Sequence, residues 1–342
     1  MNRRLKLGII GAGGIFKHAH LQAWEENEDV EFYAVCDPNK EQAQSLSEQL
    51  GVDLVYDDYK ELLKNDEIDI VDICTPNVFH SEIAILALQA GKHVLVEKPD
   101  AINPEEADKM VAAAQESEKV LMTFRNNRFR PVSQFLKQYI ENGNAGEIYT
   151  GRCGWVRRRG IPQKAGFTTK ALSGGGPLID LGVHFIDLAI WLMGNPRPVS
   201  VVGATYNKFA TNKDFNNTSF DVEDLATGFI RFDNGATLQI EFSWASHVEE
   251  QKNFLELRGT KAGIDFSNST LKLFTVIEGQ DCDIYPRLDS GTGGGHTENI
   301  HHFVDCVQKR TQPLYTPEDG VHMIKILSAI YESAEKGCEI KL

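Results

Sequence analysis

The segment GGGPLIDLGVHFIDLAIWLMG, residues 174–194, carries three ionisable side chains in an otherwise apolar stretch: Asp180, His184 and Asp187. Asp180 and His184 are four residues apart, so on one helix they would share a face. An imidazole titrates near neutral pH and can accept the proton of a reacting hydroxyl group. The segment is therefore a candidate for acid–base chemistry. Alternatively, His184 is a hydrogen-bonded core histidine and Asp180 caps the helix after the glycines.

A second candidate group, Lys98, ends the buried strand predicted within HVLVEK, residues 93–98. In sheets of parallel strands, ligands bind outside the carboxyl ends of the strands. Lys98 is therefore expected to point toward a ligand crevice. A cation in that place can stabilise the alkoxide character that develops when an alcohol is oxidised.

The stretch LGIIGAGGIF, residues 7–16, has the form of a strand, a glycine turn and the start of a helix. Gly11 allows the tight turn, and Gly13 leaves room for a pyrophosphate at the N-terminus of the helix. Phe16 replaces the third glycine of the usual dinucleotide motif. The predicted phosphate-binding segment contains Gly11, Gly13, Gly14, Ile15 and Phe16.

Asp37 ends the second predicted strand, at the place where a carboxylate can bind the ribose hydroxyls of an adenosine. The same carboxylate would repel a 2′-phosphate, and no arginine follows it directly. The sequence therefore favours NAD over NADP as cofactor. Alternatively, Asp37 only begins a turn with Pro38 and caps the next helix.

The sequence predicts two domains of different architecture that carry these candidate residues. Through about residue 124, short β-rich runs alternate with helical patterns, which predicts a doubly wound parallel sheet of the Rossmann type. The predicted strands lie in 5–10, 30–37, 68–74, 93–98 and 119–124. One predicted helix starts near residue 15, and three more cover residues 40–50, 81–91 and 104–117.

After Pro131 the pattern changes to one helix, over about 131–142, and a series of alternating strands. Turn signals at DNG (233–235) and GTKAG (259–263) join strands as hairpins, and two helices, 297–310 and 317–336, end the chain. This predicts a C-terminal α+β domain with a large, mainly antiparallel open sheet. We therefore expect a cofactor domain over 1–124 and a substrate-binding and oligomerisation domain over 125–342. DSGTGGGH, residues 289–296, is predicted to be a mobile loop.

Composition restricts the partners. The 342 residues exceed what one hydrophobic core usually holds, and a net charge of −14 disfavours nucleic acid and anionic membranes. A small molecule is the expected partner.

The six cysteines are scattered, without metal-ligand spacing, and His296, His301 and His302 lack a further ligand, so we predict free thiols and no metal site. The opening arginines precede a strand and a turn rather than a signal peptide, and no run of 18 apolar residues occurs, which favours the cytoplasm.

Five motifs, GIIGAGGI, TPNVFH, EKP, NNRFRP and GGGPLIDLGVHFIDL, occur in this order. Together they resemble the Gfo/Idh/MocA family of nicotinamide-dependent sugar and cyclitol oxidoreductases, and the resemblance extends over the whole chain. It implies that Lys98, Asp180 and His184 are catalytic, with His184 as the base. Asp180 would orient the substrate or Lys98 and hold the tautomer of the histidine. For Asp187 we expect a structural hydrogen bond.

The resemblance also implies cofactor contacts beyond the glycine turn and Asp37. These are Thr75, Pro76, Asn77 and His80 near the nicotinamide ribose, together with Glu97, Lys98 and Arg128. Two of them have structural alternatives. Asn77 could cap a helix, and Arg128 could form an ion pair between domains.

Residues 148–179 contain no acidic side chain but include Arg152, Arg157, Arg158, Arg159, Lys164 and Lys170. If this stretch covers the substrate, its cations can bind hydroxyl groups or an anionic group of the ligand. We predict Arg158 and Lys170 as substrate contacts beside Lys98, Asp180 and His184. A solvated or subunit-facing patch is the alternative.

The leading functional hypothesis is an NAD-dependent oxidoreductase that acts on a ring secondary alcohol of a sugar, a sugar derivative or a cyclitol. The alternatives are a redox-assisted, NAD-dependent glycosidase of the same family and a dinucleotide-binding sensor without turnover. An open antiparallel sheet would expose a broad face, so we also predict a homodimer or homotetramer.

Overall fold

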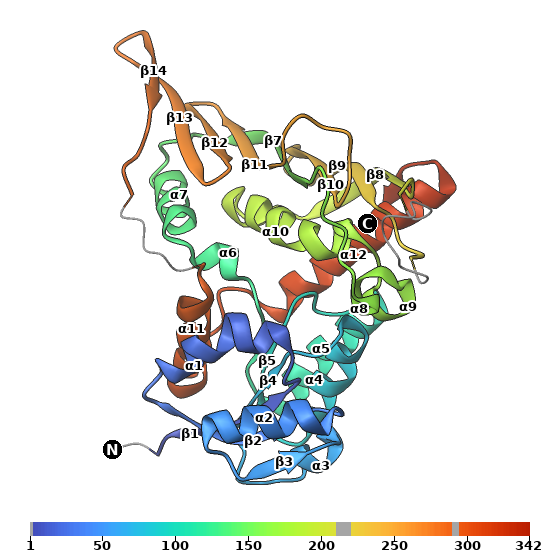
Figure 1. The fold of residues 1–342 in the computed structure, drawn as a ribbon. Helices are drawn as coiled ribbons and strands as arrows, with labels where there is room; N and C mark the ends of the chain where they lie inside the picture. The colour runs from blue at the N-terminus through green and yellow to red at the C-terminus, as the bar shows by residue number, and fades with distance from the viewer. Residues whose placement is uncertain (1–2, 210–219, 289–293) are drawn as a thin grey trace. The chain divides into compact units, whose positions relative to one another are not determined.

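The computed structural model describes residues 3–209, 220–288 and 294–342 (Figure 1). The chain folds as two compact units, one formed by residues 1–129 and 293–324 and the other by 130–292 and 325–342. The sequence had placed everything after residue 124 in the second domain, whereas the described part of 293–324 packs with the first unit. Residues 289–293 of the predicted loop lie outside the described residues.

The first unit is built on a parallel six-stranded sheet in the order β3-β2-β1-β4-β5-β6. This confirms the predicted doubly wound sheet. Its strands are β1 (Leu5–Ile10), β2 (Val30–Cys36), β3 (Leu54–Tyr56), β4 (Ile70–Ile73), β5 (His93–Val96) and β6 (Leu121–Thr123). The sequence pattern did not indicate β3, because a strand of three residues is too short to show a period.

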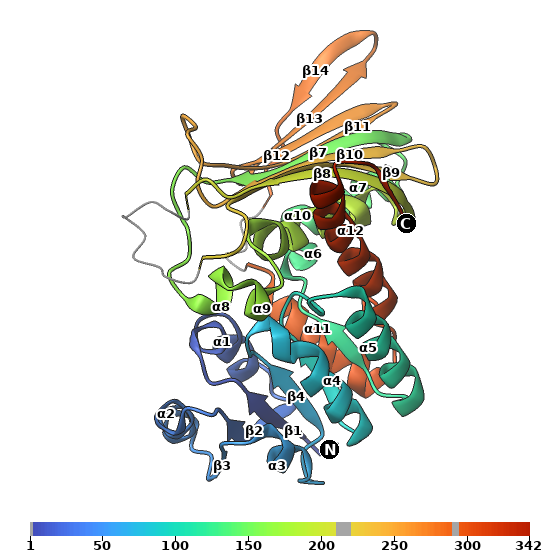
Figure 2. The same cartoon turned by 90° about the vertical axis from the view of Figure 1, so that its right-hand side faces the viewer.

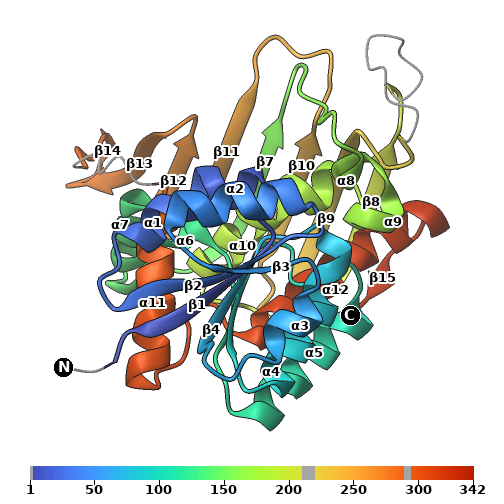
Figure 3. The ribbon, with the colours of Figure 1, turned by 60° about the horizontal axis from the view of Figure 1, so that its bottom comes forward.

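Helices cover both faces of this sheet, with α4 beside α5 and with α1 beside α11 (Figures 1 and 3). The helical elements of the first unit are η1 (Phe16–His20), α1 (Leu21–Glu25), α2 (Lys40–Leu50), α3 (Tyr59–Leu63), η2 (Asn77–Phe79), α4 (His80–Gln89), α5 (Pro104–Ser117), α6 (Asn126–Phe129) and α11 (His296–Lys309). Local sequence sets their ends. The Asn39 side chain caps α2, Asn103 caps α5, and Gly51 ends α2 in the left-handed conformation.

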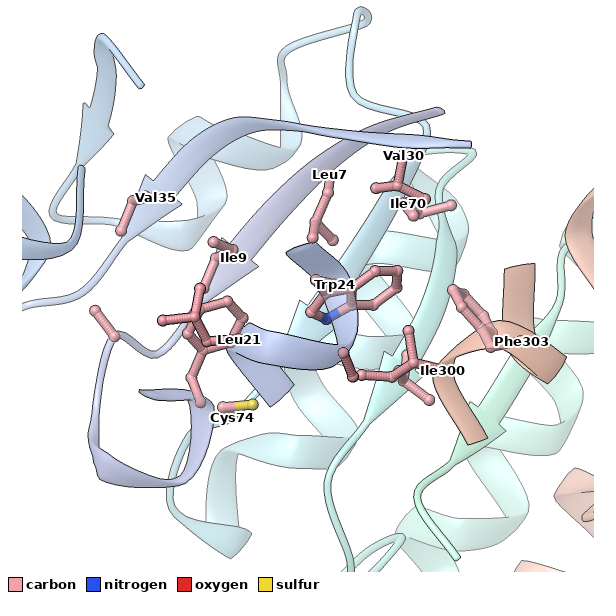
Figure 4. Packing of buried hydrophobic residues seen from close by; sticks show 14 of the residues in the cluster. Leu7, Ile9, Leu21, Trp24, Val30, Val35, Ile70, Cys74, Ile300 and Phe303 are labelled. Atoms are coloured by element: carbon pink, nitrogen blue, oxygen red, sulfur yellow. The ribbon is translucent and has the colours of Figure 1, made fainter. Parts of the chain in front are cut away.

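The core of the first unit surrounds Trp24, which is 1% exposed (Figure 4). Leu7 and Ile70 of the sheet and Ile300 and Phe303 of α11 belong to the same cluster. The Trp24 and Phe303 rings meet edge to face, with 6.4 Å between their centroids. This contact explains why α11 belongs to the first unit although it lies far along the chain.

The second unit contains a nine-stranded sheet in the order β14-β13-β12-β11-β7-β10-β9-β8-β15. Among the described strands, only the central β7–β10 pair is parallel, so the predicted, mainly antiparallel sheet is confirmed. The strands are β7 (Ile148–Val156), β8 (Pro198–Tyr206), β9 (Leu225–Phe232), β10 (Thr237–Ser243), β11 (Lys252–Gly259), β12 (Ala262–Ser267), β13 (Thr270–Ile277), β14 (Gln280–Ile284) and β15 (Ile340–Lys341). Both predicted hairpins are present, β9–β10 and β11–β12.

The helices of the second unit lie on one face of this sheet (Figure 2). They are α7 (Pro131–Glu141), α8 (Ala165–Thr168), α9 (Lys170–Ser173), η3 (Leu178–Gly182) and α10 (Val183–Leu192); α12 (Pro317–Lys336) begins in the first unit and ends in the second. The stretch Lys170–Leu192 is long and apolar enough to cross a membrane, with a mean hydropathy of 1.3. However, 83% of its apolar window is buried inside the protein, as in the core helix of a globular domain.

His93, the first residue of β5, is held in the neutral form. Its Nδ1 accepts a hydrogen bond from the Val120 backbone N–H at 3.0 Å, which requires an unprotonated nitrogen. Burial lowers the pKa of His93 to about 4. The side chain therefore resists protonation in the folded protein.

This environment predicts a pH dependence of stability. The unfolded chain binds a proton at His93 below about pH 6.5, but the folded protein binds it only near pH 4. The free energy of unfolding should therefore fall, by on the order of 2 kcal/mol, as the pH drops from about 6.5 to about 4. In His93→Asn, whose amide oxygen can still accept from Val120, urea titrations at pH 7 and 4.5 should show this loss reduced. His322→Asn, at an exposed position, is the control; equal losses in wild type and His93→Asn would contradict the prediction.

Candidate active site

The glycine turn after β1 has the shape that a pyrophosphate requires. Gly11 has a φ of +102°, and a Cβ there would lie 2.6 Å from the Cys74 carbonyl oxygen, so no other residue fits. A Cβ on Gly13 would meet nothing within 4 Å, which leaves open space beside the backbone. Phe16, in place of the third glycine, is fully buried and begins the π-helical turn η1.

Asp37 links this turn to the end of β2. Its Oδ2 accepts from the Ala12 backbone N–H at 2.9 Å, and its Oδ1 accepts from the Asn39 N–H at 2.8 Å. The cap of α2 is Asn39, so the alternative of a capping role for Asp37 is wrong. The residues around the turn fit a bound dinucleotide, because the glycines leave the cradle open and a carboxylate stands at the neighbouring strand end.

The loop after β4 carries Thr75, Pro76 and Asn77. The Thr75 hydroxyl is buried and has no hydrogen-bond partner within the part of the chain that the structure describes. Asn77 is the first residue of η2, whose N-cap is Pro76, so Asn77 does not cap this helix. His80 lies beneath the loop, with Nδ1 2.7 Å from Pro99 O and Nε2 2.9 Å from Thr75 O. Burial lowers the pKa of His80, and its ring connects two loops of the first unit.

Glu97 and Lys98 follow β5 directly. Glu97 is 6% exposed; its Oε2 accepts from the Lys98 backbone N–H at 3.0 Å, and its Oε1 lies 2.9 Å from Nε2 of the buried His20. The strand end that carries Lys98 is thus fixed by a buried carboxylate.

Arg128, another predicted cofactor contact, is 1% exposed within the first unit. Its Nη1 donates to the Leu314 carbonyl oxygen at 2.8 Å and lies 3.7 Å from Asp319 Oδ2. The guanidinium also lies over the Tyr315 ring at 4.8 Å. These contacts tie α6 to the chain that precedes α12.

In the second unit, Asp180 lies in the π-helical turn η3 and His184 in the first turn of α10. The face-sharing argument assumed one regular α-helix, whereas Asp180 precedes the regular part. The Trp244 indole N–H donates to Asp180 Oδ2 at 3.1 Å. Burial lowers the pKa of Arg157, and the Asp180 charge opposes this shift, so a guanidinium also acts on this carboxylate. Asp187 is 2% exposed within α10.

A buried carboxylate, that of Glu223, holds the glycine segment before Asp180. It accepts from the backbone N–H groups of Gly176 at 2.8 Å and Leu178 at 3.0 Å, and from the Tyr331 hydroxyl at 2.8 Å. Burial raises the pKa of Glu223, although these hydrogen bonds favour the charged form. A Cβ on Gly175 would lie 2.0 Å from the Tyr331 hydroxyl, which explains a glycine at this position.

The cations of the basic stretch, residues 148–179, contact separate partners and do not form one patch. Arg152 forms an ion pair with Glu256, at 2.7 and 2.6 Å, between neighbouring strands. The exposed Arg158 donates to the Glu249 carbonyl oxygen at 3.4 Å. Lys170 is also exposed, and its backbone N–H donates to Asp221 at 2.6 Å.

Comparison with known families decides the identity of the fold. A family model described as "Oxidoreductase family, NAD-binding Rossmann fold" matches residues 5–124, and its companion, "Oxidoreductase family, C-terminal alpha/beta domain", matches 137–342. The chain belongs to the Gfo/Idh/MocA oxidoreductase family. It is an oxidoreductase whose first unit is an NAD-binding Rossmann domain, as the sequence predicted.

Several relatives of this Gfo/Idh/MocA protein match it over nearly their whole length. D-glucoside 3-dehydrogenase of Escherichia coli (strain K12) is 34% identical over 99% of this chain and 97% of its own. Myo-inositol 2-dehydrogenase of Thermotoga maritima is 27% identical over 99% and 98%. Among solved structures, a levoglucosan dehydrogenase in complex with NADH and levoglucosan has a TM-score of 0.89 and 27% identity, with 99% of each chain covered.

Three side chains at the candidate site were not singled out from the sequence of this oxidoreductase: His20, Glu223 and Trp244. Each contacts a predicted site residue or its supporting backbone. Glu223 had a signal, because two adjacent acids in DVED precede an apolar strand. The sequence around His20 and Trp244 contains no motif that marks them, and their partners become visible in the fold.

The environment of Glu223 predicts a large loss of stability on truncation. Glu223→Ala would leave two buried N–H groups and a hydroxyl without their acceptor, which should cost about 2–4 kcal/mol of unfolding free energy. Tyr331→Phe removes one of the three hydrogen bonds and should cost about 1 kcal/mol. Urea unfolding measures both, with the exposed Glu249→Ala as control. A Glu223→Ala variant as stable as the control would contradict this role.

Proposed function

We propose that this protein oxidises a ring secondary alcohol of a sugar with NAD, and that D-glucosides are its substrate class. One observation carries the choice of substrate: the 34% identity to a D-glucoside 3-dehydrogenase over nearly the full length of both chains. The inositol and levoglucosan dehydrogenases among its relatives act on polyhydroxylated rings by name, which supports the broader class. The reverse reaction, reduction of a keto-sugar, would use the same residues.

The proposed reaction divides into a hydride transfer and a proton transfer. NAD, when bound, supplies the hydride acceptor. His184 takes the hydroxyl proton, because an imidazole is a competent base near neutral pH. Lys98 stabilises the negative charge that develops on the oxygen, and Asp180 orients the substrate or the lysine. The hydrogen bond from Trp244 and the nearby charge of Arg157 support this role, since the first holds the Asp180 carboxylate in place and the second attracts its negative charge.

For the cofactor, we propose contacts from the turn after β1 and from the carboxyl ends of β2, β4 and β5. The turn residues Gly11, Gly13, Gly14, Ile15 and Phe16 would take the pyrophosphate, and Asp37 the adenosine ribose. Thr75, Pro76, Asn77, Glu97 and Lys98 would serve the nicotinamide half, with His80 and Arg128 as supports. Arg158 and Lys170, both exposed, remain proposed substrate contacts, and Asp187 a proposed structural residue.

A product assay tests this proposal. Purified protein is incubated with NAD and a panel of alkyl D-glucosides, free sugars and inositols, and NADH absorbance is recorded beside released sugar. We expect one NADH for each glucoside oxidised, with the glycosidic bond intact. Release of sugar without accumulation of NADH would identify the redox-assisted glycosidase instead. Binding of NAD without turnover on any member of the panel would favour a sensor.

Two substitutions test the assigned roles. Lys98→Ala and His184→Ala should each lower kcat/KM by about 10²- to 10⁴-fold, because each removes a charge or a base from the transition state. In His184→Ala the rise of kcat/KM with pH near neutrality should also disappear. The exposed Lys109→Ala of α5 is the matched control. Full activity in either active-site variant would refute the corresponding role.

The β13–β14 hairpin at the edge of the nine-stranded sheet supports the proposed homodimer or homotetramer. Large apolar side chains on β13 and β14 and just after them are exposed, among them Val276 (59%), Ile277 (51%) and Tyr285 (56%). Monomeric proteins rarely leave such a cluster in contact with water. Light scattering at micromolar concentration should give at least twice the monomer mass of 38.2 kDa, and Val276→Asp should lower it. A monomeric wild type would exclude this assembly.

A further inference from the structure

In the first unit, a buried histidine is enclosed by two carboxylates. His20, at the end of η1, is fully buried; its Nδ1 lies 2.8 Å from Asp72 Oδ2 and its Nε2 lies 2.9 Å from Glu97 Oε1. Asp72 is itself fully buried in β4. The Phe124 ring stacks on the imidazole, with 4.4 Å between centroids, so the group is shielded on that side.

The hydrogen-bond geometry of this trio suits an imidazolium between two carboxylates. With Asp72 and Glu97 both as carboxylates, which only accept hydrogen bonds, each ring nitrogen of His20 carries a proton. Two further donors show that Asp72 acts as an acceptor: the Trp24 indole N–H reaches its Oδ2 at 2.7 Å, and the Cys74 thiol reaches its Oδ1 at 3.5 Å. His20 is therefore an imidazolium, and two carboxylates with one imidazolium leave a net charge of −1.

The surrounding titratable groups are consistent with this state. Burial alone would lower the pKa of His20, but the neighbouring Asp72 carboxylate holds it well above the usual value. Burial raises the pKa of Cys74 far above its usual range, so this thiol stays neutral. The His296 ring of α11 also contacts Phe124, in a tilted arrangement with 5.3 Å between centroids, and burial lowers the pKa of His296. Lys98 follows Glu97 in the chain.

The trio belongs to one half of the dinucleotide fold. Pyrophosphate binds at the turn after β1, and the two nucleosides lie on opposite sides of it. Asp37, on the β2 side, marks the adenosine half. Asp72 on β4 and Glu97 after β5 lie on the other side of β1 in the strand order, which is the nicotinamide half.

We propose that Asp72, His20 and Glu97 form a fixed negative charge that stabilises the cationic nicotinamide ring of NAD⁺ over the neutral ring of NADH, with His20 as the positioning residue that holds Glu97 beside Lys98. The reduced cofactor is then bound more weakly than the oxidised one, which favours its release after an alcohol is oxidised. The inference rests on NAD binding within the proposed function and does not depend on the sugar.

Measuring the affinity for the cofactor in the absence of sugar tests the proposed charge of the trio. Calorimetry on the full chain at pH 7.5 gives Kd for NAD⁺ and for NADH separately. Asp72→Asn removes one negative charge while keeping the size of the side chain and an acceptor for Trp24. Glu97, 2.9 Å from Nε2, remains to hold the proton on His20, and the ¹⁵N-histidine spectrum of the variant verifies that His20 is still protonated. We expect the ratio of the NADH Kd to the NAD⁺ Kd to fall by about five- to tenfold, the size expected of one unit charge acting across a partly polar interior.

Cys74→Ser is the matched control, because it alters a neutral group that contacts both Asp72 and His20. Its ratio should stay within about twofold of wild type, since no charge changes. An Asp72→Asn ratio that matches the control would overturn the proposal. Because no substrate is present, failure of sugar oxidation would leave these measurements intact, so the two proposals can fail separately.

A measurement on the wild-type protein avoids any dependence on variant folding. In ¹⁵N-histidine-labelled protein at pH 7.5, above the usual imidazole pKa, His20 should show two protonated ring nitrogens. An imidazole that titrates near 6.5 would overturn the proposal. So would stoichiometric zinc in the purified protein, because the ligand atoms of His20, Asp72 and Cys74 lie within 4.8 Å of one another and a metal would replace the protons.

Discussion

A buried carboxylate must be surrounded by hydrogen-bond donors, and both halves of the candidate site depend on this requirement. In the second unit, Glu223 collects two backbone N–H groups and a tyrosine hydroxyl, and thereby fixes the segment that leads to Asp180. In the first unit, Glu97 is fixed by His20 and by the backbone of Lys98. The residues proposed for hydride and proton transfer are thus positioned by neighbouring buried acids.

Much of the fold could be predicted from the sequence, because periodicity and local end signals agree. The helices Lys40–Leu50 and Pro104–Ser117 match their predicted ranges, since an asparagine cap precedes each of them. Strand β3, with three residues, was not found, because it contains less than two full alternations. The assignment of α11 to the first unit was also missed, because it depends on packing against Trp24.

The residues of the candidate site could likewise be predicted only in part from the sequence. Gly11 and Asp37 could be recognised, because the turn needs a positive φ and the strand end needs a carboxylate. The partners of those residues could not, since hydrogen bonds such as that of Trp244 with Asp180 join positions 64 residues apart. The π-helical turn at Asp180 was likewise invisible, because an α-helix and a π-helical turn differ by one residue in their hydrogen bonds and not in their apolar pattern.

The discontinuous first unit has a consequence for synthesis and engineering. Ile300, Phe303 and Val304 complete the cluster around Trp24, so a fragment ending at residue 124 would expose that tryptophan face to water. On the ribosome, the nucleotide-binding half cannot close its core until α11 has emerged, after most of the second unit has been made. The amino-terminal part of the chain is therefore finished late, and the two units must fold as an interleaved pair instead of one after the other.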